Sequence, residues 1–417
     1  MTSREPVSKG RILSWTLFDF ANTAFYVLIL TVGYPLYFKK IVVGSEHGDA
    51  LWGLSFSISM LVVALLSPVL GAVADYGAGK KRFLALLTAL CILATACLFF
   101  VEESMVFSGM LFLILANIGF EAGLVFYDAF LPEITTERSY GRVSGYGFAV
   151  GYVGSLVTLL IALPLYEGGF GAENLPNIRL SFVIAAGIFL LFSLPLFFFV
   201  PDLQRHAPLK FNFLAIGTKR IRATFREFSR YKNIARFLLS YFLYIDAVNT
   251  IIVFSSIFAD ETLKLNVEEI ILFFALVQTS AVIGSVFFGI FADKVGHKRS
   301  LISSLFLWVV ILAVAYVVED KTAFFGVGIL AGIALGSSQS SSRSLMSALV
   351  PAEKKTEFFG FYSFFGKASA IIGPALFGIV SSFIDQRTAL LSVGVLLIAG
   401  LILLQKVEDP SRISVEK

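Results

Sequence analysis

Six ionisable side chains interrupt the long apolar stretches of this sequence. They are Asp19, Glu121, Asp128, Asp246, Arg343 and Lys367. Because a charge is costly inside a bilayer, an ionisable residue in a membrane-spanning segment usually faces a partner, a cavity or an ion pathway. A carboxylate in such a place can carry a proton or bind an ammonium group, and an arginine can bind a carboxylate or phosphate bidentately. These residues therefore predict the binding of charged solutes or ions.

Two of the acidic residues belong to a repeated pattern, Asp-x-x-Asn-Thr. The first copy contains Asp19 and Asn22, and the second contains Asp246 and Asn249. We expect residues that both halves of a chain share to serve what the halves have in common, namely helix packing, gating or ion coupling. The alternative, that the two aspartates are substrate ligands, stays open. Asn22 and Asn249 are candidate substrate-binding residues.

Two other charged residues have no charged counterpart at the equivalent position of the other half. Glu121 corresponds to Ser340, and Arg343 corresponds to Leu124. A bound solute is rarely symmetric, so asymmetric polar residues are the better candidates for substrate contact. Gln339 precedes Arg343 by one helical turn and shares its face. Glu121 could receive an ammonium group or carry a proton, and Arg343 could hold a carboxylate. The alternatives are a gating ion pair and a static structural role.

Asp128 and Lys367 are candidates for gating or coupling. Asp128 lies near the end of its predicted span, where a carboxylate can also cap a neighbouring helix. Lys367 either extends toward the membrane surface or binds an anion.

The sequence shows no pattern of catalytic or metal-binding residues. Cys91 and Cys97 are six positions apart and do not share a helix face, so they predict neither a disulfide nor a metal pair. The three histidines are dispersed, and no nucleotide-binding loop is present. We therefore expect no enzymatic activity, no metal and no cofactor.

The elements that position these residues are membrane-spanning helices. The chain is 57% hydrophobic and 15% charged, against about 25% charged residues in a soluble domain. The apolar runs are long enough for the roughly 20 residues that a helix needs to cross a bilayer, and too long for barrel strands. Twelve spans are predicted, at 13–38, 50–74, 83–101, 106–131, 143–165, 179–200, 237–258, 269–292, 300–318, 323–349, 358–383 and 387–405.

The lysines and arginines predict the orientation. Most of the 33 basic residues fall in loops on the side that holds the N-terminus, which places both termini in the cytoplasm and the chain in the cytoplasmic (inner) membrane. Residues 1–200 and 237–417 are predicted to form one six-helix bundle each. The basic segment 201–236 is predicted to be a cytoplasmic linker near anionic lipid headgroups, with no nucleic-acid partner.

A loop motif, Gly-x-x-x-Asp, occurs once in each half. The first copy ends at Asp75 and the second at Asp293, and Lys298 and Arg299 follow the second copy. The glycine allows two helices to approach closely, and the aspartate can accept hydrogen bonds from the N-terminal end of a neighbouring helix. We expect Asp75, Asp293, Lys298 and Arg299 to take part in gating.

The two loops resemble the signature of the major facilitator superfamily. In that superfamily such loops hold the two helix bundles together on the cytoplasmic side. The first copy departs from the signature, because Ala78 stands where a second glycine is expected. Further stretches are similar to the vacuole-effluxer-like branch, long catalogued as "unknown major facilitators": residues 17–22, 131–134, 338–344 and 357–362. This resemblance implies a central cavity lined by spans one, four, seven and ten, which carry five of the six buried charges. A fungal member of the branch is associated with amino-acid export from the vacuole.

Together these observations predict an all-α integral membrane protein, with twelve transmembrane helices in two pseudo-symmetric six-helix bundles. We expect a monomeric secondary transporter that works by alternating access, coupled to protons or another ion, and that exports a small amino-acid-like or other charged organic solute. One alternative is an exporter of amphiphiles, drugs or lipids. A second is a membrane receptor that does not transport.

Overall fold

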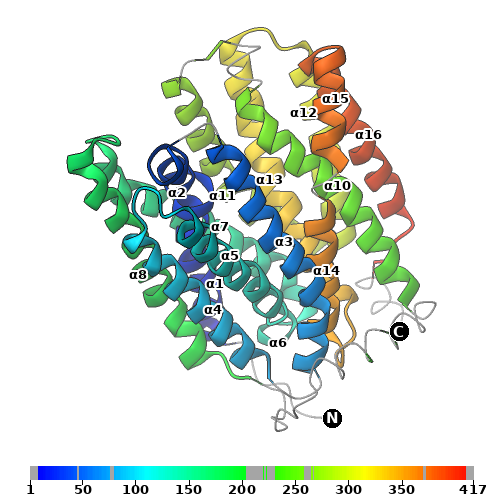
Figure 1. Ribbon diagram of the computed structural model, residues 1–417. Coiled ribbons are helices and arrows are strands. Elements are labelled where there is room, and N and C mark those ends of the chain that lie inside the picture. Colours follow the sequence, from blue (N-terminus) through cyan, green and yellow to red (C-terminus); the bar gives the residue numbers. More distant parts are fainter. Residues whose placement is uncertain are drawn as a thin grey trace. The chain divides into compact units, whose positions relative to one another are not determined.

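The computed structural model describes residues 8–44, 47–75, 79–202, 219, 222, 231–257, 264–265, 267–369 and 372–409. Every regular element in these residues is helical (Figure 1). Eleven of the described helical segments are long and apolar enough to cross a membrane. The predicted all-α membrane fold is therefore confirmed.

The chain divides into two compact units. Unit 1 comprises Met1–Ile134 and Val150–Thr218, and unit 2 comprises Thr135–Ala149 and Lys219–Lys417. Helix α7 (Tyr140–Tyr166) contributes its first part to unit 2 and the remainder to unit 1. The predicted linker 201–236 lies mostly outside the described residues, and the predicted boundaries at residues 200 and 237 stay a prediction.

Unit 1 is built on helices that pack in pairs, α1 with α8 and α5 with both α3 and α4. Its first span is irregular, because two π-helical segments, Tyr26–Thr31 and Phe38–Val43, alternate with α-helix. Its helices are α1 (Lys9–Phe25), α2 (Gly33–Tyr37), α3 (Gly48–Val73), α4 (Lys80–Cys97), α5 (Val106–Asp128), α6 (Leu131–Ile134), the second part of α7, and α8 (Leu175–Phe199), with short 3-10 turns at Leu98–Phe100 and Ala172–Asn174.

Unit 2 is arranged around the pairs α11 with α13, α12 with α13, and α10 with α16 (Figure 1). The predicted span 358–383 is covered by two helices, α14 and α15, on either side of residues 370–371, which lie outside the described part. The helices are the first part of α7 after a 3-10 turn at Glu137–Ser139, α10 (Lys232–Ile257), α11 (Val267–Val295), α12 (His297–Val317), α13 (Lys321–Leu349), α14 (Lys355–Ser369), α15 (Ile372–Phe383) and α16 (Gln386–Gln405).

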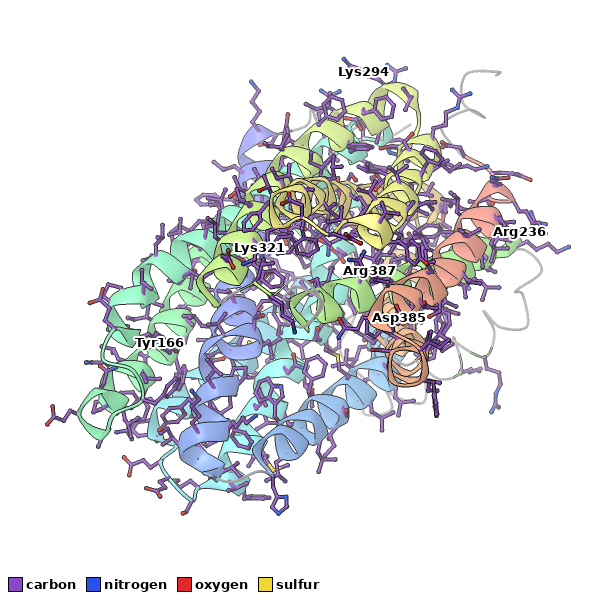
Figure 2. All side chains as sticks on the ribbon, turned by 90° about the horizontal axis from the view of Figure 1, so that it is seen from above. Tyr166, Arg236, Lys294, Lys321, Asp385 and Arg387 are labelled. Atoms are coloured by element: carbon purple, nitrogen blue, oxygen red, sulfur yellow. The ribbon has the colours of Figure 1, made fainter. Side chains whose placement is uncertain are left out.

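Aspartates begin two of the helices in unit 2. The side chain of Asp320 accepts a hydrogen bond from the amide of Ala323 in α13, and the side chain of Asp385 accepts one from the amide of Thr388 in α16. Figure 2 shows Asp385 and Arg387 at this end of α16. Each carboxylate satisfies a backbone donor that the first turn of a helix leaves without a partner. These caps fix where the two spans begin.

Two equivalent turns explain the repeated loop motif. Gly79 and Gly296 each precede a helix with positive φ, 78° and 100°, a backbone conformation that side chains with a Cβ rarely adopt. The amide of Lys81 donates to Asp202 and that of Lys298 to Asp409, both at 3.1 Å. The turn glycine of the first copy is therefore Gly79, one position later than the sequence comparison suggested.

Candidate functional site

Asp19 is held inside unit 1 by an aromatic pair. Its Oδ2 accepts a hydrogen bond from the Tyr127 hydroxyl at 2.6 Å. The Tyr127 ring stacks on Trp15 at 4.6 Å, and the Trp15 Nε1 donates to the Tyr127 carbonyl at 3.0 Å. The carboxylate therefore joins α1 to α5, which is a packing role of the kind expected for a residue that both halves share.

A second cluster on α1 and α5 contains Glu121, whose side chain is 5% exposed. The ring of Phe120 lies 5.0 Å from that of Phe25 and 6.4 Å from that of Tyr26. Tyr26 also lies within electrostatic range of Glu121. A carboxylate within electrostatic range of an aromatic ring is an arrangement that attracts ammonium groups, because ring faces stabilise cations.

Asn22 adds an amide to this cluster, one helical turn before Tyr26. It is 4% exposed, and its Nδ2 has no hydrogen-bond partner among the described residues. The π-helical segment begins at Tyr26. Such departures from α-helix are frequent at functional sites. We call Asn22, Phe25, Tyr26, Phe120 and Glu121 the Glu121 cluster.

Sequence analysis missed a buried ion pair at one end of unit 1. Lys80 is fully buried, and its Nζ lies 2.6 Å from Glu133 and donates to the Ala129 carbonyl at 2.9 Å. The ring of Phe130 lies 5.0 Å from the same Nζ. The signal was present in the sequence, as a lysine just before the third predicted span, 83–101, and the Glu of the stretch 131–134. Asp75 and Asp128 are both half-buried.

In unit 2, Asp293 binds the first turn of α7. Its Oδ1 accepts from the Gly141 amide at 2.8 Å, and its Oδ2 accepts from the Arg142 Nε at 2.6 Å. A Cβ on Gly141 would lie 2.3 Å from the Gly289 carbonyl oxygen, so glycine is needed for this approach of α7 to α11. The expected contact of the motif aspartate with a helix N-terminus is confirmed. Its role in gating stays a prediction.

The basic residues of the same loop face different surroundings. The Lys298 Nζ donates to the Gln405 carbonyl at 2.7 Å, which ties α12 to the end of α16. Arg299 is exposed.

Arg343 also binds α7 in unit 2. It is 2% exposed, its Nε donates to the Ser144 Oγ at 3.0 Å, and its Nη2 donates to the Ser144 carbonyl at 2.8 Å. The guanidinium carbon lies 4.0 Å from the centre of the Phe148 ring. We call this contact the Arg343 clamp. Gln339, one turn earlier on α13, is half-buried.

Asp246 is a residue of α10 and is 1% exposed. Its Oδ2 accepts a hydrogen bond from the Gly373 amide of α15 at 2.8 Å. Its Oδ1 and the Thr250 Oγ1 have no hydrogen-bond partner among the described residues. Asn249 and Lys367 are half-buried. Asp246 thus joins α10 to α15, within the predicted span 358–383.

The described residues form no group of three or more His, Cys, Asp or Glu side chains that could hold a metal ion. The charged groups described above can bind charged solutes and protons.

Known proteins with similar sequences include an MFS-type transporter and several autophagy-related proteins. The family described as "Vacuole effluxer Atg22 like" matches residues 47–141 and 134–413. An uncharacterized MFS-type transporter, YxiO of Bacillus subtilis, is 31% identical and covers 97% of this chain and 96% of its own. Autophagy-related protein 22 of Kluyveromyces lactis is 22% identical over 78% of this chain and 73% of its own.

Solved structures confirm the fold. A bacterial homologue of the iron transporter ferroportin, in an outward-facing state, matches with a TM-score of 0.73 at 15% identity over 96% of this chain and 99% of that one. The proton:xylose symporter XylE matches with a TM-score of 0.73 at 13% identity, over 96% and 95% of the two chains. The chain is a multi-pass membrane transporter of the major facilitator superfamily and belongs to its vacuole effluxer Atg22-like family.

Proposed function

We propose that this transporter is a secondary active exporter of a small amino-acid-like solute or another charged organic solute. It works by alternating access and is driven by protons or another coupling ion. The observation that carries the proposal is the buried carboxylate of Glu121, which lies within electrostatic range of Tyr26, whose ring is 6.4 Å from that of Phe120. The family description, a vacuole effluxer, supports export as the direction.

The Glu121 cluster suits the ammonium group of such a solute. A carboxylate in a poorly hydrated place binds a cation more strongly than it would in water, because the local dielectric constant is low. The aromatic rings of Phe25, Tyr26 and Phe120 add a face that attracts cations and excludes anions. The Asn22 Nδ2, which has no hydrogen-bond partner among the described residues, is a donor and suits an acceptor atom on the solute. A solute with an ammonium group and a hydrogen-bond acceptor, as in an amino acid, satisfies all three features.

Arg343 remains the candidate partner for a solute carboxylate. In the structure its guanidinium is engaged with Ser144 and Phe148, which favours a gating or structural role in the state observed. Asp19, Asp246, Asp128, Lys367 and the loop residues Asp75, Asp293, Lys298 and Arg299 are proposed to serve gating or coupling. The protein is proposed to lie in the cytoplasmic membrane as a monomer, with both termini in the cytoplasm.

A thermal-shift screen of purified protein tests the solute class. Wild type, Glu121→Gln and the exposed control Glu103→Gln are heated with amino acids, dipeptides, organic acids, amines and amphiphiles. A ligand that binds only the folded form raises the melting temperature. We expect ammonium-bearing solutes to stabilise wild type and Glu103→Gln and to lose most of this effect in Glu121→Gln. Equal stabilisation of all three proteins by apolar amphiphiles would contradict the proposal.

A further inference from the structure

Asn117 is a buried asparagine of unit 1 that sequence analysis did not single out. It belongs to α5, four positions before Glu121, and its side chain is 0% exposed. A polar group inside a membrane-spanning helix is unfavourable unless hydrogen bonds satisfy it. The partners of the two ends of its amide therefore show what this residue can still bind.

The nitrogen end of the Asn117 amide is fixed by α3. The Asn117 Nδ2 donates to the Ser59 Oγ at 2.6 Å, and the Ser59 Oγ donates in turn to the Phe56 carbonyl at 2.7 Å. A serine hydroxyl has one proton to donate. Because the Phe56 carbonyl takes that proton, Ser59 can only accept from Asn117, and the amide turns its nitrogen toward α3.

The oxygen end of the same amide is an acceptor that remains unused. The Asn117 Oδ1 is buried and has no hydrogen-bond partner among the described residues. An amide oxygen can accept two hydrogen bonds, and folded proteins leave few buried acceptors without a donor. This oxygen therefore suits an N–H or O–H donor from outside the described part of the chain.

Asn117 and Glu121 lie on the same face of α5. Side chains four positions apart on a helix are neighbours, with Cβ atoms about 5–6 Å apart. The opposite face packs on α4, since a Cβ on Gly119 would lie 2.6 Å from the Leu87 carbonyl oxygen and 2.7 Å from the Cys91 amide nitrogen. Asn117 and Glu121 thus share the face of α5 that turns away from α4.

The exposure of the side chains changes along the Glu121 cluster. Tyr26 is 47% exposed, whereas Glu121 is 5% and Asn117 0% exposed. The cluster is accessible at Tyr26 and enclosed by protein at Asn117. Asn117 therefore occupies the place that the inner end of a binding site would have.

A primary ammonium group matches the two acceptors of this face. It offers three N–H donors, of which the Glu121 carboxylate can take one or two and the Asn117 Oδ1 another. A quaternary ammonium group carries the same charge but has no N–H donor, so it would leave the Asn117 oxygen without a partner. A site built to hydrogen-bond a solute rejects an analogue that lacks the bonding group, because its own buried polar groups are then unpaired.

We propose that Asn117 is a specificity-determining residue of the solute site, whose Oδ1 accepts an N–H hydrogen bond from the ammonium group held by Glu121. Ser59 is a positioning residue, because it holds the amide nitrogen at α3 and leaves the oxygen for the solute. The inference rests on the proposed function and narrows its substrate class to solutes with an N–H donor on the cationic group.

Thermal-shift titration of purified protein tests this selection. The probes are L-amino acids and their N,N,N-trimethyl derivatives, which keep the positive charge and lack the N–H donors. We expect wild type to bind an amino acid better than its trimethyl derivative. In Asn117→Leu, the affinity for the amino acid should fall about tenfold, and the affinity for the derivative should change little.

Leucine is close to asparagine in volume and leaves the Ser59 hydroxyl bound to the Phe56 carbonyl. The matched control is Asn177→Leu, the same change at an exposed asparagine of unit 1, which should bind both probes as wild type does. A purely structural role of Asn117 would lower the melting temperature of the free protein and leave the ratio of the two affinities unchanged.

Ser59→Ala gives a second readout, which also serves if Asn117→Leu does not fold. Without the Ser59 hydroxyl the amide can turn its nitrogen toward the solute, so the preference for the amino acid should shrink. A preference as large as that of wild type in Asn117→Leu, or in Ser59→Ala where the first variant does not fold, overturns the inference. Equal binding of both probes by wild type overturns it too, and in these cases the proposed function stands. If no ammonium-bearing probe stabilises wild type, the proposed function fails and the inference fails with it.

Discussion

At the scale of single residues, the buried charges of this transporter are held by partners that come from distant parts of the sequence. Asp19 is bound by Tyr127, Lys80 by Glu133, and Arg343 by Ser144. Asp19 and Arg343 can be recognised from the sequence, because each is a charged residue within a long apolar run. Their partners cannot be recognised in this way, because those contacts depend on which helix faces meet.

Replacing Tyr127 by phenylalanine removes the hydroxyl that donates to Asp19 and leaves the ring stacked on Trp15. A hydrogen bond to a charged group contributes about 1.5–3 kcal/mol, so we expect a clear loss of thermal stability in Tyr127→Phe. Tyr316→Phe, at a tyrosine that is 41% exposed, is the control and should change the melting temperature little. If Tyr127→Phe is as stable as the control, the Asp19 contact is not structural.

The Arg343 clamp predicts coupling between two substitutions. Arg343→Lys keeps the charge but loses the planar fork that reaches both oxygens of Ser144, and Ser144→Ala removes one of those oxygens. Because both changes break the same contact, their effects on the free energy of unfolding should not add, with a coupling energy on the order of 1 kcal/mol. A double-mutant cycle measures this coupling. Strict additivity would show that the clamp does not form.

At the scale of elements, the apolar runs predicted the membrane-spanning helices well, but their irregularities were not visible in the sequence. The first span alternates α- and π-helix over Lys9–Val43. Hydropathy reports how long an apolar run is, and it does not report the hydrogen-bond pattern of the backbone. The spacing of the motif placed the turn at Ala78, one position before Gly79, because spacing does not encode φ.

Asp293 is expected to hold the first turn of α7. Asp293→Ala removes the acceptor for the Gly141 amide, so hydrogen exchange of the first-turn amides of α7 should become faster. Asp320→Ala is the matched control, because this aspartate caps α13 and should expose only the amides at the start of that helix. Hydrogen exchange with mass spectrometry resolves the two segments. Unchanged exchange at α7 in Asp293→Ala would contradict the structural role of the motif.

At the scale of the whole molecule, the distribution of lysine and arginine predicts which loops face the cytoplasm. Single cysteines introduced at Glu103 and Glu319 should react with an impermeant thiol reagent added to intact cells, and one at Glu353 should not. The native Cys91 and Cys97 are first replaced by serine. Labelling of Glu353→Cys alone would reverse the proposed orientation.

The fold and the family of this protein follow from its sequence, because repeats and loop motifs are properties of the chain itself. The solute does not follow from it, because solute specificity depends on a few side chains whose arrangement the repeat does not encode. The central claim is that this transporter moves a charged solute by coupling it to protons.

Flux into proteoliposomes, with and without a pH gradient, tests this claim most directly. The solute is the one that stabilises wild type in the thermal-shift screen. We predict that the gradient accelerates flux in wild type and that Glu121→Gln transports poorly under both conditions. Wild-type flux that ignores the gradient, or no flux at all, would contradict the account.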